Sequence, residues 1–313
     1  MLDADSRALL ERIAAAGAPP VWASTPPAAR EAFRARQALA PPGPPMRRVR
    51  DAVIPGRDGR GVPARLFEPE DAGAPPATLL FLHGGGWVLG DLDGFEPFAR
   101  RLAAATRATV VLADYRLAPE HPYPAALHDA IDALTWAATS RGGELPDGPL
   151  AVLGDSAGGN LAAAAMRHAV RDGTRVDACV LVYPVVDHDF GTASYLDEDN
   201  QLLVDARAMR WFWDQYVPDA ARRDEPDAAP LRADLGDLAG FPPTLVIAAE
   251  HDVLLDEGRA YTERLRAAGV AVEYRLFAGQ MHGFFTNAFL PVGEQALREA
   301  ARWLGERLGA ARP

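Results

Sequence analysis

The fold of this 313-residue chain is decided by the stretch Leu150-Ala151-Val152-Leu153-Gly154-Asp155-Ser156-Ala157-Gly158-Gly159. Its first residues are apolar and predict a buried strand, and the alanine-rich residues 157–171 predict a helix directly after it. Between them the sequence matches G-x-S-x-G, a turn so tight that the residues two before and two after the serine must be small. We therefore expect the hydroxyl of Ser156 to project at the carboxyl end of a sheet, where the amides of the helix N-terminus favour negative charge.

The same stretch has a second interpretation, as a glycine-rich turn that binds a phosphate or merely packs. A dinucleotide-binding turn would have glycine at position 156, where serine stands. A catalytic serine is therefore the favoured hypothesis.

Outward from this stretch, short apolar strands alternate with helices. The predicted strands are 78–82, 109–113, 150–153, 178–183, 244–248 and 272–277, preceded by a hairpin of 48–54 and 62–68. The predicted helices are 95–105, 125–139, 157–171, 257–268 and 294–308. This alternation is typical of the α/β class and predicts a mostly parallel central sheet of about eight strands with helices on both faces.

Two segments interrupt the alternation. Residues 1–46 carry two short helical stripes, the second at 28–39, separated by proline-rich breaks that include 26–27. Residues 187–239 are too long for a simple connection, and their aromatic residues predict a helical insertion: Trp211, Phe212, Trp213 and Tyr216. An insertion of this length inside a compact domain is usually functional and often forms a lid.

The composition excludes several functions. All 32 basic residues are arginines, so a P-loop, Schiff-base catalysis and a Ser-Lys pair are excluded. The 43 acidic residues give a net charge of −11, which argues against nucleic acid or an anionic membrane as a partner. The lone Cys179 fits a reducing compartment, and neither a signal peptide nor a membrane span is recognisable. We therefore expect a soluble, cytoplasmic protein.

A second motif, His83-Gly84-Gly85-Gly86-Trp87, directly follows the predicted strand 78–82. Its three glycines expose backbone N–H groups without side-chain obstruction. Two such donors and the amide of Ala157, the residue after the serine, would make an oxyanion hole. The alternative is a phosphate-cradling loop, which is disfavoured because no lysine follows it.

A serine hydroxyl needs a base to take its proton and an acid to orient that base. Of the seven histidines, His282 stands just past the last predicted strand, at the carboxyl end of the sheet. Asp252 occupies the corresponding place after strand 244–248, with Glu250 and Asp256 as alternatives for the acid. Asp256 and Glu257 are instead expected to cap the following helix.

No metal or other cofactor is expected. The clusters Glu250-His251-Asp252 and Asp187-His188-Asp189 resemble ligand sets, but adjacent residues seldom converge on one ion. No further ligand set stands out at a useful spacing.

Taken together, these motifs resemble the hormone-sensitive lipase family of bacterial carboxylesterases, within the α/β-hydrolase superfamily. The resemblance covers the chain from about residue 47 onward. It rests on the two motifs quoted above, extended to Asn160, and on four further stretches: Asp114-Tyr115-Arg116-Leu117-Ala118-Pro119-Glu120, Tyr183-Pro184, Asp252-x-Leu254-x-Asp256-Glu257-Gly258 and His282-Gly283-Phe284. Asp155 before the serine is one of the family's recurring variants.

The resemblance implies a two-step acyl transfer. Ser156 would be the nucleophile, His282 the base and Asp252 the orienting acid, with an oxyanion hole made by the amides of Gly85, Gly86 and Ala157. It further implies an α/β-hydrolase domain over residues 47–313, with residues 1–46 and an insertion at about 187–239 forming a helical cap.

A capped pocket favours short- to medium-chain acyl esters as the small-molecule substrate. The alternatives are a deacetylase, lactonase or amidase that acts on a specific natural product, and a non-catalytic protein that binds a small ligand. The family also suggests a homodimer formed through strand 272–277.

Overall fold

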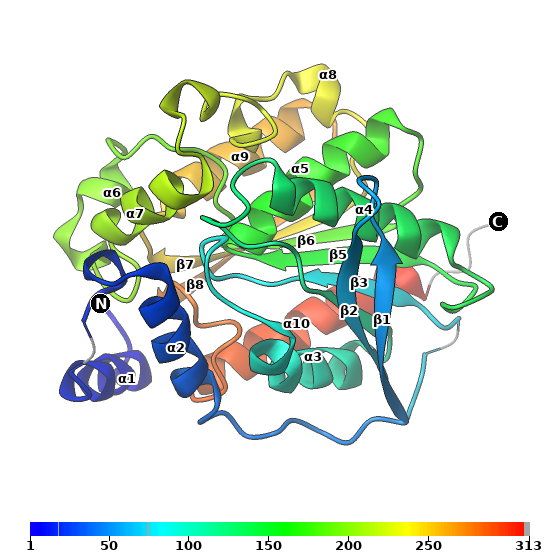
Figure 1. Ribbon diagram of the computed structural model, residues 1–313, viewed down its shortest axis with the longest axis horizontal. Helices are drawn as coiled ribbons and strands as arrows, with labels where there is room; N and C mark the ends of the chain where they lie inside the picture. Colours follow the sequence, from blue (N-terminus) through cyan, green and yellow to red (C-terminus); the bar gives the residue numbers. More distant parts are fainter. Residues whose placement is uncertain (18, 74, 310–313) are drawn as a thin grey trace.

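The computed structural model of this chain describes residues 1–17, 19–73 and 75–309. Within them, eight strands form one sheet in the order β1-β2-β4-β3-β5-β6-β7-β8 (Figure 1). The strands are β1 (Arg48–Pro55), β2 (Gly61–Glu68), β3 (Thr78–Leu82), β4 (Thr109–Ala113), β5 (Leu150–Asp155), β6 (Ala178–Val182), β7 (Thr244–His251) and β8 (Val272–Met281). β2 pairs antiparallel with β1 and with β4, and every other neighbouring pair is parallel.

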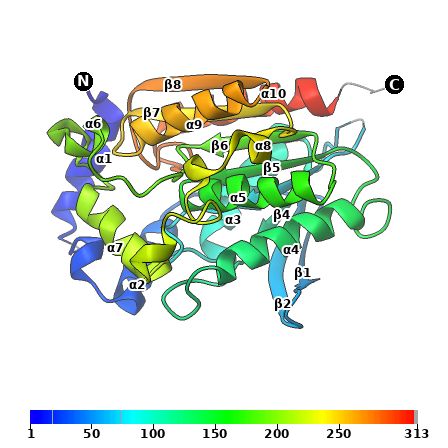
Figure 2. The same ribbon diagram turned by 90° about the horizontal axis from the view of Figure 1, so that it is seen from above.

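Helices cover both faces of this sheet (Figures 1 and 2). One face carries α4 (Ala125–Thr139), α5 (Ala157–Arg171) and α9 (Leu255–Ala267), and the other carries α3 (Leu92–Thr106) and α10 (Pro291–Leu308). Successive strand residues point to opposite faces, so Val152 joins the core on the α5 side and Leu153 the core on the α3 side. The predicted α/β class, with its mostly parallel sheet, is confirmed.

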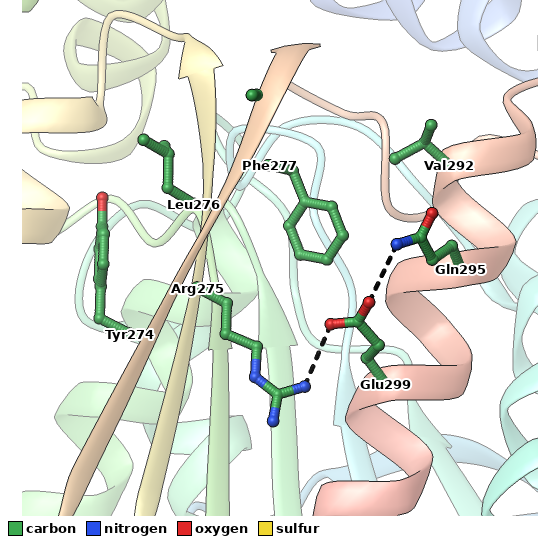
Figure 3. Close-up of a pocket in the computed structure, with 8 residues that line it drawn as sticks. Tyr274, Arg275, Leu276, Phe277, Val292, Gln295 and Glu299 are labelled. Carbon is green, nitrogen blue, oxygen red and sulfur yellow. Dashed lines mark hydrogen bonds and ion pairs between the residues drawn. The ribbon is translucent and has the colours of Figure 1, made fainter.

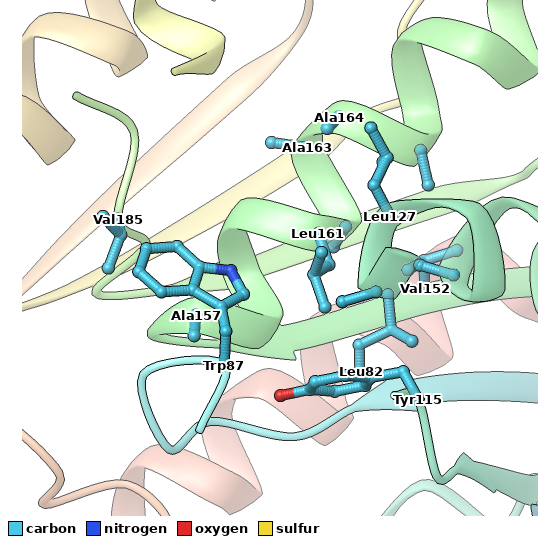
Figure 4. Close-up of a cluster of buried hydrophobic side chains, with 14 of the residues drawn as sticks. Leu82, Trp87, Tyr115, Leu127, Val152, Ala157, Leu161, Ala163, Ala164 and Val185 are labelled. Atoms are coloured by element: carbon cyan, nitrogen blue, oxygen red, sulfur yellow. The ribbon is translucent and has the colours of Figure 1, made fainter. Parts of the chain in front are cut away.

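The core on the α5 side extends up to the serine turn. Figure 4 shows Leu82 and Val152 beneath Leu161 of α5, with the indole of Trp87 at the edge of the cluster, near Val185 and Ala157. The serine turn therefore stands on tightly packed apolar side chains, which resist displacement.

Three element boundaries differ from the sequence prediction in an informative way. α2 spans Pro26–Gln37, so the Pro26-Pro27 pair predicted as a break instead opens the helix behind its N-cap Thr25. Proline is well suited to this place because the first helical N–H needs no partner within the helix. β7 and β8 continue to His251 and Met281, past the predicted ends at 248 and 277, so Asp252 and His282 directly follow their strands.

The two segments predicted to interrupt the alternation lie near each other in space. Residues 1–46 form α1 (Ala4–Ala15), η1 (Val21–Ala23) and α2, and the insertion forms mainly α6 (Ala193–Leu196), α7 (Ala206–Tyr216) and α8 (Leu235–Leu238). Figures 1 and 2 show α1, α2, α6 and α7 beyond the end of the sheet to which the arrowhead of β7 points. Trp22 links the segments, since its Nε1 donates to Asp205 Oδ2 at 3.4 Å and the Arg207 guanidinium lies 5.1 Å from its ring.

β8 is an edge strand of the sheet, and the homodimer expected through residues 272–277 stays a prediction. None of the helices that the structure describes is long and apolar enough to cross a membrane.

Candidate active site

Ser156 stands in a strained turn between β5 and α5. Its φ of 55° and ψ of −118° are conformations that side-chain-bearing residues rarely adopt. The turn is closed by glycines on either side. A Cβ on Gly154 would lie 2.2 Å from the Gly158 carbonyl oxygen, and one on Gly158 would lie 1.9 Å from the Leu82 carbonyl oxygen. Positions 154 and 158 can therefore hold only a very small residue, as the sequence predicts.

We predict that Gly158→Ala destabilises the protein by about 2–4 kcal/mol, because its Cβ would meet the backbone of β3, which cannot give way. Gly305→Ala in α10 is the matched control: nothing lies within 4 Å of its Cβ, so alanine should stabilise the helix by about 0.5–1 kcal/mol. Urea unfolding measures both changes. Equal stability of the two variants would contradict the close approach of α5 to β3.

The structure brings Ser156, His282 and Asp252 together at the carboxyl ends of β5, β8 and β7. His282 Nε2 lies 2.9 Å from Ser156 Oγ, and His282 Nδ1 lies 2.7 Å from Asp252 Oδ2. The other Asp252 oxygen, Oδ1, accepts from the Leu254 amide at 3.0 Å, and the Tyr183 ring packs 4.5 Å from the imidazole. All three are buried, with 8%, 6% and 1% of Ser156, His282 and Asp252 exposed. The imidazole is thus held with one nitrogen toward a carboxylate and the other toward the serine hydroxyl.

The alternative acids are engaged elsewhere. Glu250 accepts from the Gly279 amide at 2.7 Å. Asp256 lies in the first turn of α9, but its Oδ2 accepts from the Ser194 amide of α6 at 2.8 Å. Asp252 is thus the candidate acid that the structure places beside His282.

Glu257 also departs from the expected role of a helix cap. It is buried in the first turn of α9, and its Oε1 accepts from the amides of Val186 and Asp187 at 2.7 and 3.2 Å. Burial raises the pKa of this carboxyl well above its usual value. Asp256 and Glu257 therefore tie α9 to the start of the insertion instead of closing their own helix.

His83 is fully buried and does not approach Ser156. Its ring stacks between Phe95 and Tyr115, with centroids 4.6 and 4.4 Å away, and its Nδ1 lies 2.7 Å from the Gly84 carbonyl oxygen. Burial lowers the pKa of His83 to about 4, so this imidazole is neutral near pH 7. His83 supports the glycine loop, which leaves His282 as the histidine in contact with the serine.

The glycine loop is fastened to the serine turn through Asp155. The Gly84 amide donates to Asp155 Oδ1 at 2.8 Å, and burial raises the pKa of Asp155 to about 7. Further along, Gly85 and Gly86 adopt φ values of 119° and 60°, conformations that glycine adopts without strain. Among the described residues, none accepts from the amides of Gly85, Gly86 or Ala157. These three N–H groups therefore have no acceptor among the residues that the structure describes.

Trp87 anchors the same loop to the insertion. Its fully buried indole stacks on Tyr216 of α7 at 4.3 Å and 8°, and meets Trp213 edge-on at 5.2 Å. Phe212 of α7 lies against Gly86 itself, because a Cβ on Gly86 would lie only 2.1 Å from Phe212 Cδ1. The inner side of α7 thus packs directly on the loop that carries Gly85 and Gly86.

Sequence reasoning missed Leu203. A Cβ on Gly283, the residue after His282, would lie 3.6 Å from Leu203 Cδ2, which places this leucine beside the imidazole loop. Leu203 stands in an irregular stretch just before α7, so no periodicity marked it as a contact residue. The sequence marks Phe212 only as one member of the aromatic group at 211–216.

A groove of about 560 Å³ lies away from the serine, between β8 and α10 (Figure 3). Its lining includes Leu276, Phe277 and Val292, and Arg275 and Glu299 form an ion pair across it at 3.2 Å. None of the serine-site residues lines this groove. Within the described parts of the chain, no group of three histidine, cysteine, aspartate or glutamate side chains is placed to hold a metal ion.

Comparisons with known proteins agree with this architecture. A family described as the alpha/beta hydrolase fold matches residues 79–286, a range that spans the site from His83 to His282. Carboxylic ester hydrolase LipN of Mycobacterium tuberculosis is 42% identical over 268 residues, which cover 82% of this chain and 70% of LipN. The ethyl acetate hydrolase of Pseudomonas putida is 37% identical over 242 residues, which cover 75% of each chain.

A solved structure resembles this chain over nearly its whole length. The crystal structure of a thermostable esterase from Pseudomonas putida superposes with a TM-score of 0.91 at 34% identity, covering 99% of this chain and 98% of the esterase. The likeness therefore extends over the whole fold, including the segments that interrupt the strand–helix alternation. The chain belongs to the α/β-hydrolase family, within its branch of serine carboxylesterases that resemble hormone-sensitive lipase.

Proposed function

We propose that the protein hydrolyses short- to medium-chain carboxylic esters, with Ser156, His282 and Asp252 as its catalytic triad. The observation that carries this proposal is the chain of two contacts, 2.9 Å from serine to imidazole and 2.7 Å from imidazole to carboxylate. An aspartate that accepts from Nδ1–H leaves Nε2 free to take the serine proton.

The reaction proceeds through an acyl-enzyme. Ser156 Oγ attacks the ester carbonyl carbon while His282 Nε2 takes the hydroxyl proton, and Asp252 stabilises the imidazolium that forms. The amides of Gly85, Gly86 and Ala157 bind the oxyanion of the tetrahedral intermediate. The intermediate expels the alcohol, which receives the proton from His282. Water then repeats the sequence on the acyl-enzyme, releasing the carboxylic acid and restoring Ser156.

We further propose that residues 1–46 and about 187–239 form a helical cap on the α/β-hydrolase domain of residues 47–313. The contact of Trp22 with Asp205 supports this division, because it joins the two segments beyond the end of the sheet where the serine lies. Phe212 lies against Gly86 and Leu203 lies near Gly283, so two apolar side chains of the insertion border the loops that carry Gly86 and His282. We propose that these two side chains limit the acyl group to short and medium chain lengths.

Hydrolysis of p-nitrophenyl esters from acetyl to palmitoyl tests this proposal. We expect kcat/KM to be highest between acetyl and octanoyl and to fall on the order of tenfold or more for palmitoyl, because we propose that Phe212 and Leu203 limit the length of the acyl chain. Phe212→Ala should move the optimum toward longer chains, because it removes the six-carbon ring that lies against Gly86 and so opens space there. Phe190→Ala, an aromatic residue of the same insertion that packs on Tyr195, is the matched control and should leave the optimum in place.

Two results would count against the proposal. A folded wild-type protein that is inactive on every ester would overturn ester hydrolysis, and lactones, acetyl esters of natural products and amides would be the next substrates to examine. A rate that rises steadily up to palmitoyl would overturn the narrow pocket while leaving ester hydrolysis intact. Circular dichroism confirms that each variant is folded before its rates are compared.

A further inference from the structure

Arg30 of α2 reaches from the N-terminal segment to the loop that carries Gly85 and Gly86. Its Nε donates to the Val88 carbonyl oxygen at 2.8 Å, and its Nη2 donates to the Ala118 carbonyl oxygen at 2.8 Å. The same guanidinium forms a two-pronged ion pair with Glu120, with Nη1–Oε1 at 2.8 Å and Nη2–Oε2 at 2.6 Å. Only 16% of the Arg30 side chain is exposed.

The two carbonyl groups that Arg30 binds belong to loops that are also joined to each other. The amides of Val88 and Leu89 donate to the Gly85 carbonyl oxygen at 3.2 and 2.9 Å, closing a turn over residues 85–89. The Ala118 amide donates to the Trp87 carbonyl oxygen at 2.9 Å. Arg30 therefore fastens the far end of the glycine turn, while the Gly84 contact with Asp155 fastens the near end.

The chemistry of the side chain fits this task. A guanidinium offers several N–H donors in one rigid plane, so it can bind two carbonyl oxygens and a carboxylate at once. Glu120 balances its charge, and the Arg30 hydrogen bonds lower the pKa of Glu120 to about 2, so the pair stays ionised at neutral pH. A lysine ammonium is a compact point charge and cannot span these acceptors in the same geometry.

The glycine turn needs such external support. Gly85 and Gly86 have no side chains to pack, and glycine is the residue with the greatest backbone freedom. An oxyanion hole works only when its donors are already aimed at the position of the oxyanion, and a shift of about 1 Å can cost on the order of a hundredfold in rate.

We propose that Arg30 is a positioning residue for the oxyanion hole, which holds the 85–89 turn so that the amides of Gly85 and Gly86 point at the reacting carbonyl. The inference rests on the proposed triad and oxyanion hole and adds a residue from the N-terminal segment to their support. Its rival is a purely structural role, in which Arg30 only ties α2 to the domain.

Arg30→Met and Arg30→Lys, compared with wild type, separate these roles. Two quantities are measured: kcat and KM for p-nitrophenyl butanoate, and the inhibition constant of an alkyl trifluoromethyl ketone, which adds to the serine and places an oxyanion in the hole. We expect kcat to fall on the order of tenfold to a hundredfold with KM changed less than about threefold, and the ketone to bind more weakly by a similar factor. Arg30→Lys should recover little of the lost kcat and ketone affinity, since a positive charge alone does not hold the two carbonyl groups.

Arg34→Met is the matched control. Arg34 lies one turn further along α2 and pairs with Asp91 at 2.6 Å, but its side chain is 59% exposed and it binds no carbonyl of the glycine turn. It should leave both quantities unchanged. Glu120→Gln removes the charge partner and keeps the two carbonyl acceptors, so it should cost less than Arg30→Met.

Two results would overturn the positioning role of Arg30. Unchanged kcat and ketone affinity in a folded Arg30→Met protein, with only a lower melting temperature, would leave Arg30 with a structural role alone. A loss in Glu120→Gln equal to that in Arg30→Met would overturn the assignment to the two carbonyl contacts. Failure of the proposed triad looks different, because wild type itself would then neither hydrolyse the ester nor bind the ketone.

Discussion

Replacing Ser156 with alanine is expected to lower kcat for p-nitrophenyl butanoate by on the order of 10⁵- to 10⁶-fold. The variant would lose the oxygen that we propose to form the acyl-enzyme, and any residual rate would come from substrate binding and the proposed oxyanion amides. The fold should survive, because Ser156 Oγ hydrogen-bonds only to His282 among the described side chains and alanine takes the same turn at similar cost. Initial rates test the loss of kcat, and a thermal melt tests whether the fold survives.

A chemical label tests the identity of the nucleophile independently. A p-nitrophenyl phosphonate ester should modify wild type once, and mass spectrometry should place the adduct on the peptide that contains Ser156. The Ser156→Ala variant should stay unmodified. Hydrolysis that persists in this variant, or an adduct on another residue, would mean that the serine of the 154–158 turn is not the nucleophile.

Asp252→Asn carries the second-largest expected effect, a loss on the order of 10⁴-fold in kcat. An amide in place of the carboxylate cannot stabilise the imidazolium, and its NH₂ group would favour the wrong tautomer of His282. The contact that changes is the 2.7 Å approach of Asp252 Oδ2 to His282 Nδ1. Rates with p-nitrophenyl butanoate, measured for wild type and variant in the same buffer, give the comparison.

Two neighbouring carboxylates serve as matched controls. Glu250→Gln and Asp256→Asn make the same chemical change within four positions of Asp252, but their carboxylates accept from the amides of Gly279 and Ser194. We expect each to lower kcat less than about tenfold, since neither group touches His282. A collapse of activity in one of them, with Asp252→Asn largely active, would move the acid to that residue.

The sequence predicted the parts of the site that depend on local geometry. The small residues at 154 and 158 follow from the tightness of one turn, and the places of Asp252 and His282 follow from the rule that parallel strands end at the same edge. Strand ends were less predictable. β7 and β8 run on past Glu250 and Gly279, residue types that are depleted in strands, because the two strands pair again at His251 and Met281 after an irregularity between Ala249 and His251.

The sequence could not reveal contacts between residues that lie far apart along the chain. Arg30 meets Val88 and Ala118, and Leu203 meets Gly283, contacts that leave no periodic trace in either segment. For Asp256 and Glu257 the sequence does suggest a role, that of helix caps, but this prediction is wrong. A local rule for the first turn of a helix fits them well, but tertiary hydrogen bonds to Ser194 and Val186 decided where their carboxylates point.

The stacking of Trp87 on Tyr216 bears on how such an enzyme could be re-engineered. Exchanging the insertion for that of another esterase is an obvious route to new substrates, and it treats the insertion as a detachable module. In this protein the insertion and the rest of the chain share one aromatic cluster. Trp87 belongs to the glycine loop, and Trp213 and Tyr216 belong to the insertion. A transplanted insertion would have to bring matching rings, whereas its remaining surface could be redesigned with far fewer constraints.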